Sequence, residues 1–427
     1  MTQQKQNGNL VAIIMMIFLF GMISFVTNLA APMGVIVKAQ FQASNFLGML
    51  GNFANFAAYA FMGIPAGLLL QRVGYKRTAL LAIIVGFIGV GVQFLSGVAA
   101  SFIVYLLGAF ICGFSVCILN TVVNPMLNTL GGGGKKGNQL LQVGGSFNSL
   151  TGTITPMLVG AMIGQVTKDT AISDVNPVLF IAMGVFAVVF VVLSLVKINE
   201  PHLSAAKASG TVVKHAYSPW AFRHFILGAV GIFIYVGVEV GIPATMNLFL
   251  EDPAAGNVGA TIAGFVAGTY WFLMLIGRFI GASVGGKVSS KTMLAVASSI
   301  GIVFVLAAIV APLGTPVSIP VFTGSGFAMT QVPVSALFLV LCGLCTSVMW
   351  GGIFNLAVEG LGKYVAAASG IFMMMVCGGG ILPLLQNYIA DHATYMISYL
   401  IPVAGLAYLL FYALAGSKNV NKNIPVD

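Results

Sequence analysis

Twelve long apolar stretches, each long enough to cross a membrane as a helix, make up most of the 427-residue chain. The hydrocarbon core of a bilayer is about 30 Å thick, so a helix needs about 20 apolar residues to cross it. The stretches are residues 10–37, 45–71, 77–97, 100–129, 138–166, 175–197, 223–249, 257–282, 290–312, 332–360, 362–390 and 393–415. Only 6% of all residues are charged, against about 25% in a soluble chain. We therefore predict an all-α membrane protein with twelve transmembrane helices.

The distribution of Lys and Arg predicts the orientation in the membrane. The first apolar stretch continues past Asn28 without a small-residue cleavage site, which favours a retained helix over a signal peptide. Twelve spans place both termini on one side, and of the 18 Lys and Arg residues only Lys38 and Lys168 fall on the other side. Cytoplasmic loops carry such an excess, so both termini are predicted to be cytoplasmic. The net charge of +9 is thus a topology signal, and we expect no nucleic-acid partner.

No group of residues typical of an enzyme or a metal centre stands out. The five cysteines all lie inside apolar stretches, where we interpret them as small packing residues without disulfides or metal. The four histidines lie in links or at helix ends and show no ligand spacing. We therefore expect no enzymatic activity, no metal and no cofactor. A fold of this kind works as a monomer, which is the state we expect.

The longest polar link divides the predicted spans into two sets of six. We predict an N-terminal six-helix bundle at 1–197, a cytoplasmic linker at 198–222 and a C-terminal six-helix bundle at 223–427. Many transporters consist of two such halves with the solute site between them, near the midplane of the membrane. The other long link is 313–331.

The first span of each half carries a polar residue one turn before a proline. Asn28 precedes Pro32 by four residues, and Glu239 precedes Pro243 by four. A proline inside a helix frees the carbonyl four residues earlier, which here is the carbonyl of Asn28 or Glu239. A freed carbonyl in a membrane needs a partner or a wet cavity, and the alternative is an ordinary kink.

Amide and aromatic side chains recur inside the spans and predict a sugar site. Amides donate and accept hydrogen bonds to hydroxyl groups, and aromatic rings suit the apolar face of a sugar ring. A multidrug pocket would be more apolar, and a phosphate site would need a basic residue at mid-depth, whereas Arg278 is expected at the cytoplasmic end of its helix. The alternative is that the amides tie helices together. The predicted substrate-binding residues are Asn28, Asn52, Asn55, Asn120, Asn124, Gln142, Asn148, Tyr235, Glu239, Asn247, Trp271, Trp350 and Asn355.

Glu239 is the acidic residue expected deep in the membrane without a basic residue in its own span. Such a carboxyl group is costly to bury and tends to be functional. Three roles stay open. It could be neutral and carry a proton, it could stay charged and coordinate a cation such as sodium, or it could be a hydrogen-bonded structural group.

The link between the second and third spans reads GLLLQRVGYKR, from Gly67 to Arg77. Gly74 permits a tight turn, and the basic side chains of Arg72, Lys76 and Arg77 can bind carbonyl groups at helix C-termini. This segment resembles the loop signature of the major facilitator superfamily, although Gln71 occupies the acidic position. We predict that it is a conformational loop.

Longer segments resemble one branch of that superfamily, the fucose–galactose–hexose symporters of bacteria. They are LNTVVNPMLNTLG from Leu119, GGSFNSLTGTITP from Gly144, GRFIG from Gly277 and the run from Gly352 to Pro383. The resemblance implies uptake of a monosaccharide across the bacterial inner membrane by alternating access, coupled to a proton or sodium ion.

The chain departs from this branch at the acidic positions. Fucose–proton members carry an acid shortly after the Asn-Leu pair of the first span, where Ala30 and Ala31 stand here. They carry a second acid where this chain has Asn120, and a glutamine where it has Gly145. The residues that match the branch are Asn28, Asn124, Phe147 and Asn148, and Glu239 matches the Y-V-G-x-E pattern of its hexose members.

The sequence therefore predicts sugar uptake with cation coupling through Glu239. An uncoupled sugar facilitator, and a drug or metabolite exporter on the same fold, are the alternatives. The kind of sugar stays open among a hexose, a deoxyhexose, an N-acetylated (amino) sugar and an acidic sugar. The last two are included because the loss of two carboxylates removes repulsion of an anion.

Overall fold

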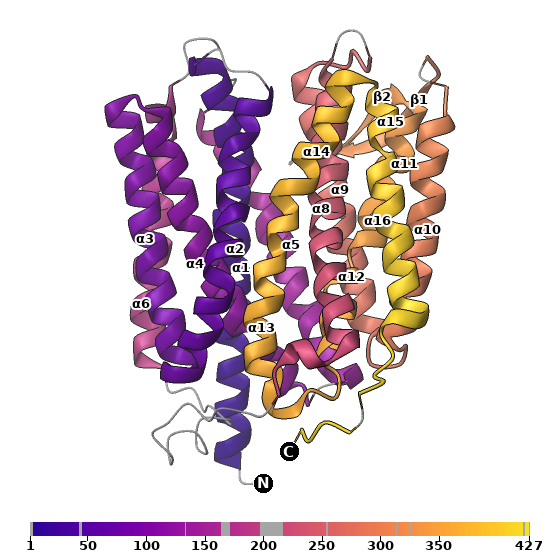
Figure 1. Cartoon of the computed structure of the whole chain (residues 1–427). Coiled ribbons are helices and arrows are strands. Elements are labelled where there is room, and N and C mark those ends of the chain that lie inside the picture. Colours follow the sequence, from indigo (N-terminus) through magenta and orange to yellow (C-terminus); the bar gives the residue numbers. More distant parts are fainter. Residues whose placement is uncertain are drawn as a thin grey trace.

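The computed structural model is a bundle of long helices that run side by side, with both termini at the same end (Figure 1). We call that end the termini side. The structure describes residues 3–41, 45–132, 134–163, 171–196, 217–252, 255–312, 314–323, 326–421 and 423–426. Predictions that concern other residues, among them most of the linker 198–222, lie outside these ranges.

The first group of helices forms the N half. Its elements are α1 (Gln3–Phe41), α2 (Asn45–Val73), α3 (Tyr75–Ala99), α4 (Phe102–Leu130), α5 (Gly134–Ile163), the short turn η1 (Ile172–Val175) and α6 (Asn176–Leu195). Helix α4 packs against α3 and α2, and α1 packs against α5. The half is thus one compact group of helices from consecutive sequence.

The second group forms the C half. It begins with η2 (Pro219–Ala221), α8 (Arg223–Glu251), α9 (Ala260–Val284) and α10 (Ser290–Val310). After a β-hairpin follow α11 (Val334–Thr346), α12 (Met349–Val358), η3 (Gly362–Tyr364), α13 (Val365–Met374), η4 (Met375–Cys377) and α14 (Gly378–His392), then α15 (Tyr395–Ser398), α16 (Leu400–Phe411) and η5 (Tyr412–Gly416). The stretch 362–390 contains a 3₁₀ turn at Met375–Cys377, directly before three consecutive glycines, Gly378 to Gly380.

The prediction of an all-α membrane protein with twelve spans is confirmed. Within the described residues, eleven helical segments are long and apolar enough to cross a membrane. Helix α5, with 30 residues, is the remaining long helix and the most polar one. The boundaries 197 and 223 of the predicted halves stay a prediction, since most of the link between α6 and α8 is outside the described ranges.

The link 313–331 contains a β-hairpin that we did not predict. Strand β1 (Pro316–Phe322) pairs antiparallel with β2 (Phe327–Pro333), in a register that runs from Pro316 opposite Pro333 to Phe322 opposite Phe327. The alternation of Val317, Ile319 and Val321 with smaller residues is a strand period that could have revealed it. The Phe322 ring stacks on Phe272 of α9, with centroids 4.7 Å apart, so the hairpin lies against the C half.

The turn between α2 and α3 has the geometry that its sequence requires. Gly74 adopts a φ of 86°, a conformation that other residues rarely adopt. The Lys76 ammonium donates to the carbonyls of Ser194 and Val196, at 2.8 and 2.7 Å, at the C-terminal end of α6. Arg72 and Arg77 are exposed, and Gly67 packs against Gly370 of α13. The role of this segment as a conformational loop stays a prediction.

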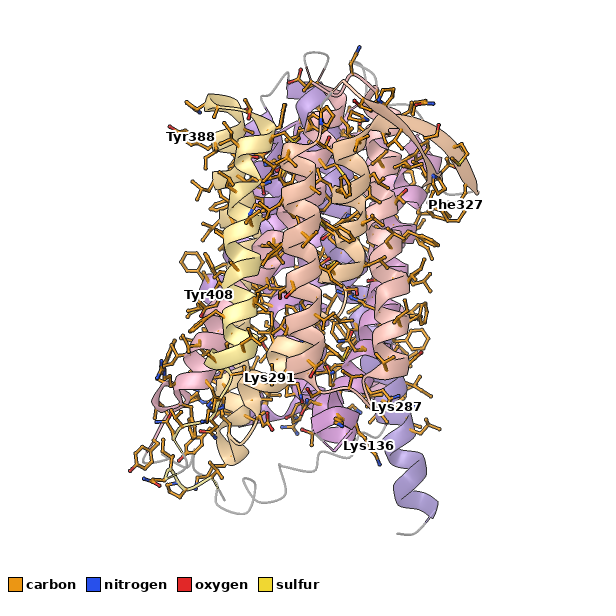
Figure 2. All side chains as sticks on the ribbon, turned by 90° about the vertical axis from the view of Figure 1, so that its right-hand side faces the viewer. Lys136, Lys287, Lys291, Phe327, Tyr388 and Tyr408 are labelled. Carbon is orange, nitrogen blue, oxygen red and sulfur yellow. The ribbon has the colours of Figure 1, made fainter. Side chains whose placement is uncertain are left out.

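Basic side chains gather at the termini side. Lys136, Lys287 and Lys291 all lie at this end of the bundle (Figure 2). Lys135 extends from the N half to the carbonyl of Lys287 in the C half, at 3.0 Å. The Arg278 side chain lies inside the bundle, as described below.

The two halves approach each other closely where α2 meets α13. Gly63 of α2 packs against the backbone of Gly370 and Met374, and a Cβ atom at Gly63 would overlap the Met374 nitrogen. Small residues at such crossings allow two helix backbones to come together in a membrane. This contact therefore depends on glycine.

We expect Gly63→Val to lower the free energy of unfolding by about 1–3 kcal/mol, because the added side chain overpacks the crossing of α2 and α13. Thermal unfolding in detergent micelles measures the effect. Gly91→Val is the control, since a Cβ atom at Gly91 of α3 meets no atom within 4 Å. Equal losses in the two variants would contradict the close crossing.

Candidate functional site

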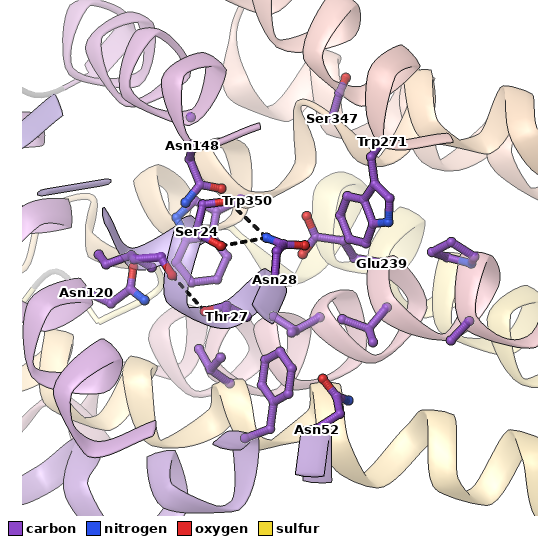
Figure 3. Close-up of a pocket in the computed structure, with 18 of the residues that line it drawn as sticks. Ser24, Thr27, Asn28, Asn52, Asn120, Asn148, Glu239, Trp271, Ser347 and Trp350 are labelled. Atoms are coloured by element: carbon purple, nitrogen blue, oxygen red, sulfur yellow. Dashed lines mark hydrogen bonds between the residues drawn. The ribbon is translucent and has the colours of Figure 1, made fainter. Parts of the chain in front are cut away.

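A cavity of about 360 Å³ lies between the two halves. This volume is in the range of about 300–1,000 Å³ that small-molecule sites occupy. Helices α1, α2, α4 and α5 line it from the N half, and α8, α9 and α12 line it from the C half (Figure 3). Its polar lining consists of Ser24, Thr27, Asn28, Asn52, Tyr59, Asn120, Gln142, Asn148, Glu239, Asn247, Trp271, Arg278, Ser347 and Trp350.

Most of the predicted substrate-binding residues come together around this cavity. They are Asn28, Asn52, Asn120, Gln142, Asn148, Glu239, Asn247, Trp271 and Trp350. These residues come from both halves of the sequence, so the fold brings distant polar positions to one place. Their contact with a substrate stays a prediction.

Four predicted residues lie outside the lining, which corrects the prediction that they face the cavity. Asn124 lies one layer behind it, where it accepts a hydrogen bond from the Trp350 indole at 2.9 Å. Tyr235 is fully buried and donates to the Thr346 carbonyl at 3.2 Å. Asn55 donates to the Ala109 carbonyl at 3.4 Å, and Asn355 donates to Ser290 at 3.0 Å.

Helix geometry explains why only part of a four-residue stripe faces the cavity. A step of four residues turns about 40° beyond a full rotation of the helix, so Asn120, Asn124 and Asn128 spiral around α4. Asn120 lines the cavity, Asn124 turns behind Trp350, and Asn128 donates to Asn355 of the other half at 3.2 Å. The alternative that amides tie helices together is thus correct for Asn124 and Asn128.

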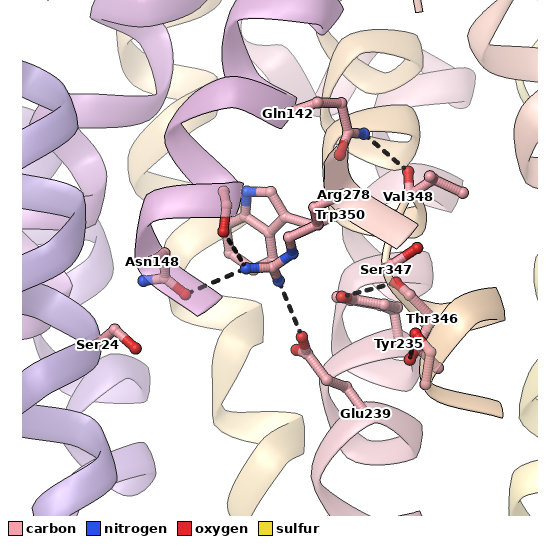
Figure 4. Close-up of polar contacts among 12 residues, drawn as sticks. Ser24, Gln142, Asn148, Tyr235, Glu239, Arg278, Thr346, Ser347, Val348 and Trp350 are labelled. Atoms are coloured by element: carbon pink, nitrogen blue, oxygen red, sulfur yellow. Dashed lines mark hydrogen bonds and ion pairs between the residues drawn. The ribbon is translucent and has the colours of Figure 1, made fainter. Parts of the chain in front are cut away.

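The centre of the site is an ion pair that the sequence analysis missed. An Nη2 hydrogen of Arg278 on α9 donates to Oε1 of Glu239 on α8, at 3.2 Å (Figure 4). The two side chains are only 8% and 12% exposed. We expected Arg278 at the cytoplasmic end of its helix and no basic side chain at the depth of the cavity, but the Arg278 side chain reaches it. Glu239 has no basic residue nearby in its own span, as expected, and its partner comes from α9. Helix α9 continues to Val284, and the long arginine side chain extends into the cavity from a position inside the helix.

Neighbouring groups fix the orientation of the lining side chains. Asn148 donates to the Phe20 carbonyl of α1 at 2.9 Å, and its Oδ1 accepts from Arg278 at 3.2 Å. Asn28 donates to the carbonyl of Ser24 at 2.8 Å, and Asn120 donates to the Tyr59 hydroxyl at 2.9 Å. Asn28, Asn120 and Asn148 are therefore oriented amides rather than free side chains.

The carbonyl freed by Pro243 has a partner. The Tyr270 hydroxyl donates to the Glu239 carbonyl at 3.2 Å, and Thr346 lies 2.9 Å from the same hydroxyl. This bond satisfies the group that the proline ring leaves without a helix donor. The corresponding proline of α1, Pro32, lies outside the described side chains.

Two tryptophans supply the aromatic surface of the cavity. Trp271 meets Tyr270 edge to face, with centroids 5.4 Å apart. Trp350 packs between Tyr235 at 6.3 Å and Phe372 at 6.2 Å. Both indoles are thus held by aromatic neighbours while they line the cavity.

Hydrogen bonds between the halves occur at the cavity and on its termini side, in the part of the chain that the structure describes. Gln139 donates to the Ala282 carbonyl at 3.0 Å, and Gln142 donates to the Val348 carbonyl at 3.2 Å. Asn128 and Lys135 make the further bonds given above. The halves are therefore joined between the cavity and the termini side.

The sequence profile of the Major Facilitator Superfamily matches residues 13–383. The chain belongs to this superfamily. Membership confirms the predicted resemblance, the two-half helical fold and the prediction of a transporter rather than an enzyme.

Relatives and solved structures agree with this assignment. The glucose/galactose transporter of Brucella abortus is 32% identical over 98% of this chain and 96% of the relative. The L-fucose-proton symporter of Escherichia coli K12 is 22% identical over 91% of this chain and 90% of the relative. A crystal structure of the E. coli fucose:proton symporter has a TM-score of 0.74 at 19% identity, covering 95% of this chain and 98% of that one. A second structure of that symporter, in the outward conformation, has a TM-score of 0.71 at 20% identity, with 94% and 98% covered.

The residues that sequence reasoning missed are mostly small or bulky neighbours of the predicted ones. Ser24 and Thr27 line the cavity from α1 together with Asn28, and the available signal was that Ser24 precedes Thr27 by three residues and Asn28 by four. Ser347 and Phe20 carry no such signal. Arg278 stood in the GRFIG segment, but nothing in the sequence placed its side chain beside Glu239.

We expect Arg278→Met to destabilise the protein by about 3–5 kcal/mol near neutral pH, because it leaves the Glu239 carboxylate buried without a counter-charge. The double variant Arg278→Met/Glu239→Gln removes both charges and should recover most of this loss. Thermal unfolding of both variants in the same detergent makes the comparison. A double variant as unstable as the single one would show that the ion pair is not what stabilises this region.

Proposed function

We propose that the protein takes up a neutral monosaccharide across the bacterial inner membrane by alternating access. The observation that carries the proposal is the cavity between the halves, which combines oriented amides with two tryptophans. Sugar hydroxyls suit the amides, and the apolar face of a sugar ring suits an indole. The names of the glucose/galactose and fucose relatives support the same substrate class.

The electrostatics of the cavity favour a neutral sugar over an acidic one. Among the described lining residues, Arg278 and Glu239 are the charged groups, and they pair with each other. An anionic sugar would have to compete with Glu239 for the guanidinium, whereas a neutral sugar leaves the pair intact. The amide-rich lining likewise disfavours an exporter of lipophilic compounds.

The hydrogen bonds that join the two halves on the termini side support a state of the transport cycle that is closed on that side. Because Gln139, Gln142 and Asn128 connect the halves between the cavity and that side, a solute in this state exchanges with the opposite side. We propose that the termini side is cytoplasmic, in agreement with the excess of Lys and Arg there. Delivery of the sugar then requires these bonds to break.

We propose that one chain is sufficient for this cycle.

Glu239 is our candidate for cation coupling. It is the carboxylate among the described lining residues, and it contacts Arg278, which in turn bonds to the N half. A proton or a sodium ion at Glu239 would change the charge of the ion pair and thereby the contact between the halves. An uncoupled facilitator on the same site is the alternative.

We expect the protein in proteoliposomes to accumulate D-glucose, D-galactose or L-fucose when a proton or sodium gradient is imposed. Glu239→Gln should abolish accumulation and retain sugar exchange, because glutamine can still accept a hydrogen bond from Arg278 but cannot take up a proton. Radiolabelled uptake and counterflow measure the two activities. Asp252→Asn is the control, since Asp252 lies at the end of α8 outside the cavity lining. Unchanged accumulation by Glu239→Gln would assign coupling elsewhere.

We expect Trp271→Ala and Trp350→Ala each to raise the dissociation constant of the sugar about tenfold, equivalent to about 1.4 kcal/mol. Each substitution removes an aromatic face of the cavity. Isothermal titration calorimetry measures the change. Trp220→Ala is a matched control, because the chain has 3 tryptophans and Trp220 lies outside the cavity lining. An equal effect of all three substitutions would contradict the proposed sugar site.

A further inference from the structure

Gly145 of α5 lies directly beside Arg278 of α9. Its carbonyl oxygen accepts a hydrogen bond from Nη1 of Arg278 at 2.7 Å. A Cβ atom at position 145 would stand 3.3 Å from Cδ and 3.5 Å from Nε of the arginine. The space that a side chain would fill is therefore occupied by the arginine, which enters the cavity along the bare backbone of α5.

Arg278 joins one cavity-lining group from each half. Nη1 also donates to Oδ1 of Asn148 on α5, and Nη2 donates to Oε1 of Glu239 on α8, both at 3.2 Å. Figure 4 shows the guanidinium between these two side chains. Asn148 and Glu239 both line the cavity, so a solute that contacts them contacts both halves.

The hydrogen-bond pattern leaves Asn148 with a single orientation. Its amide nitrogen faces the Phe20 carbonyl, which only accepts, and its oxygen faces the guanidinium, which only donates. A flipped amide would lose both bonds. The guanidinium is needed for this arrangement because its planar fork directs several donors in fixed directions, whereas a lysine ammonium is a single point charge on a flexible stem.

We propose that Gly145 and Arg278 act together as positioning residues for the sugar site. Gly145 admits the guanidinium, and the guanidinium holds Asn148 of the N half and Glu239 of the C half in the orientation that binds sugar hydroxyl groups. A bound sugar is then held across the interface between the halves, so occupancy of the site is sensed by both. This inference rests on the proposed sugar transport and adds a specific role for a glycine in the cavity wall.

A double-mutant cycle on sugar affinity tests the pair. Gly145→Gln, whose side chain displaces the guanidinium, should raise the dissociation constant about tenfold, and Arg278→Ala should have an effect of similar size. The double variant should be no weaker than either single variant, since both changes remove the same positioning. If the two increases in the dissociation constant multiply in the double variant, Gly145 and Arg278 act independently, which overturns the proposal.

Two further variants separate positioning from charge and from packing. Arg278→Lys keeps the charge and should still bind the sugar about tenfold more weakly, because it lacks the fork. Gly145→Ala adds one methyl group and should weaken binding about twofold or more in the natural background, but not in the Arg278→Ala background. Full affinity in Arg278→Lys, or the same loss from Gly145→Ala in both backgrounds, would contradict the proposal.

Gly264→Ala is the matched control on α9. A Cβ atom at this exposed position meets no atom within 4 Å, so sugar affinity should stay within about twofold of the unsubstituted protein. All constants are measured by calorimetry on the full chain in detergent with D-glucose, D-galactose and L-fucose. If the unsubstituted protein binds none of the three sugars, the proposed function fails. If it binds one and the cycle is additive, only the positioning pair fails.

Discussion

The ion pair between Arg278 and Glu239 is the interaction on which the geometry of the cavity depends. A buried charge is strongly unfavourable without a partner, so each of these groups requires the other. Both belong to the C half, yet Arg278 also bonds to Gly145 and Asn148 of the N half. The same guanidinium thus satisfies a charge within one half and contributes to the contact between the two.

Small residues and polar contacts both contribute to the contact between the halves. Gly63 lets α2 approach α13, while Gln139, Gln142 and Lys135 bond to carbonyl groups of the C half. A hydrogen bond of this kind contributes about 0.5–1.5 kcal/mol net, so a few of them can form and break in a cycle.

The sequence predicted the parts of this structure that depend on periodicity and hydropathy. Apolar stretches located the spans, and Asn28, Asn120, Gln142 and Glu239 line one cavity because polar side chains avoid lipid. It could not show which residues of a stripe turn away, as Asn124 does, because that depends on how α4 is rotated against its neighbours. The position of Arg278 depends on side-chain length and on space beside Gly145, and neither is visible in a linear pattern.

The resemblance to fucose–proton symporters implies acidic groups in the first and fourth spans, and this chain has none there. Asn120 stands at one of these positions and bonds to Tyr59 as a neutral amide. The carboxylate in the described lining is Glu239, on the opposite side of the cavity. The cavity of this chain thus contains a negative charge from the C half. Because a buried carboxylate needs a counter-charge, its presence is consistent with an arginine at 278 and with the small residue at 145 that leaves room for it.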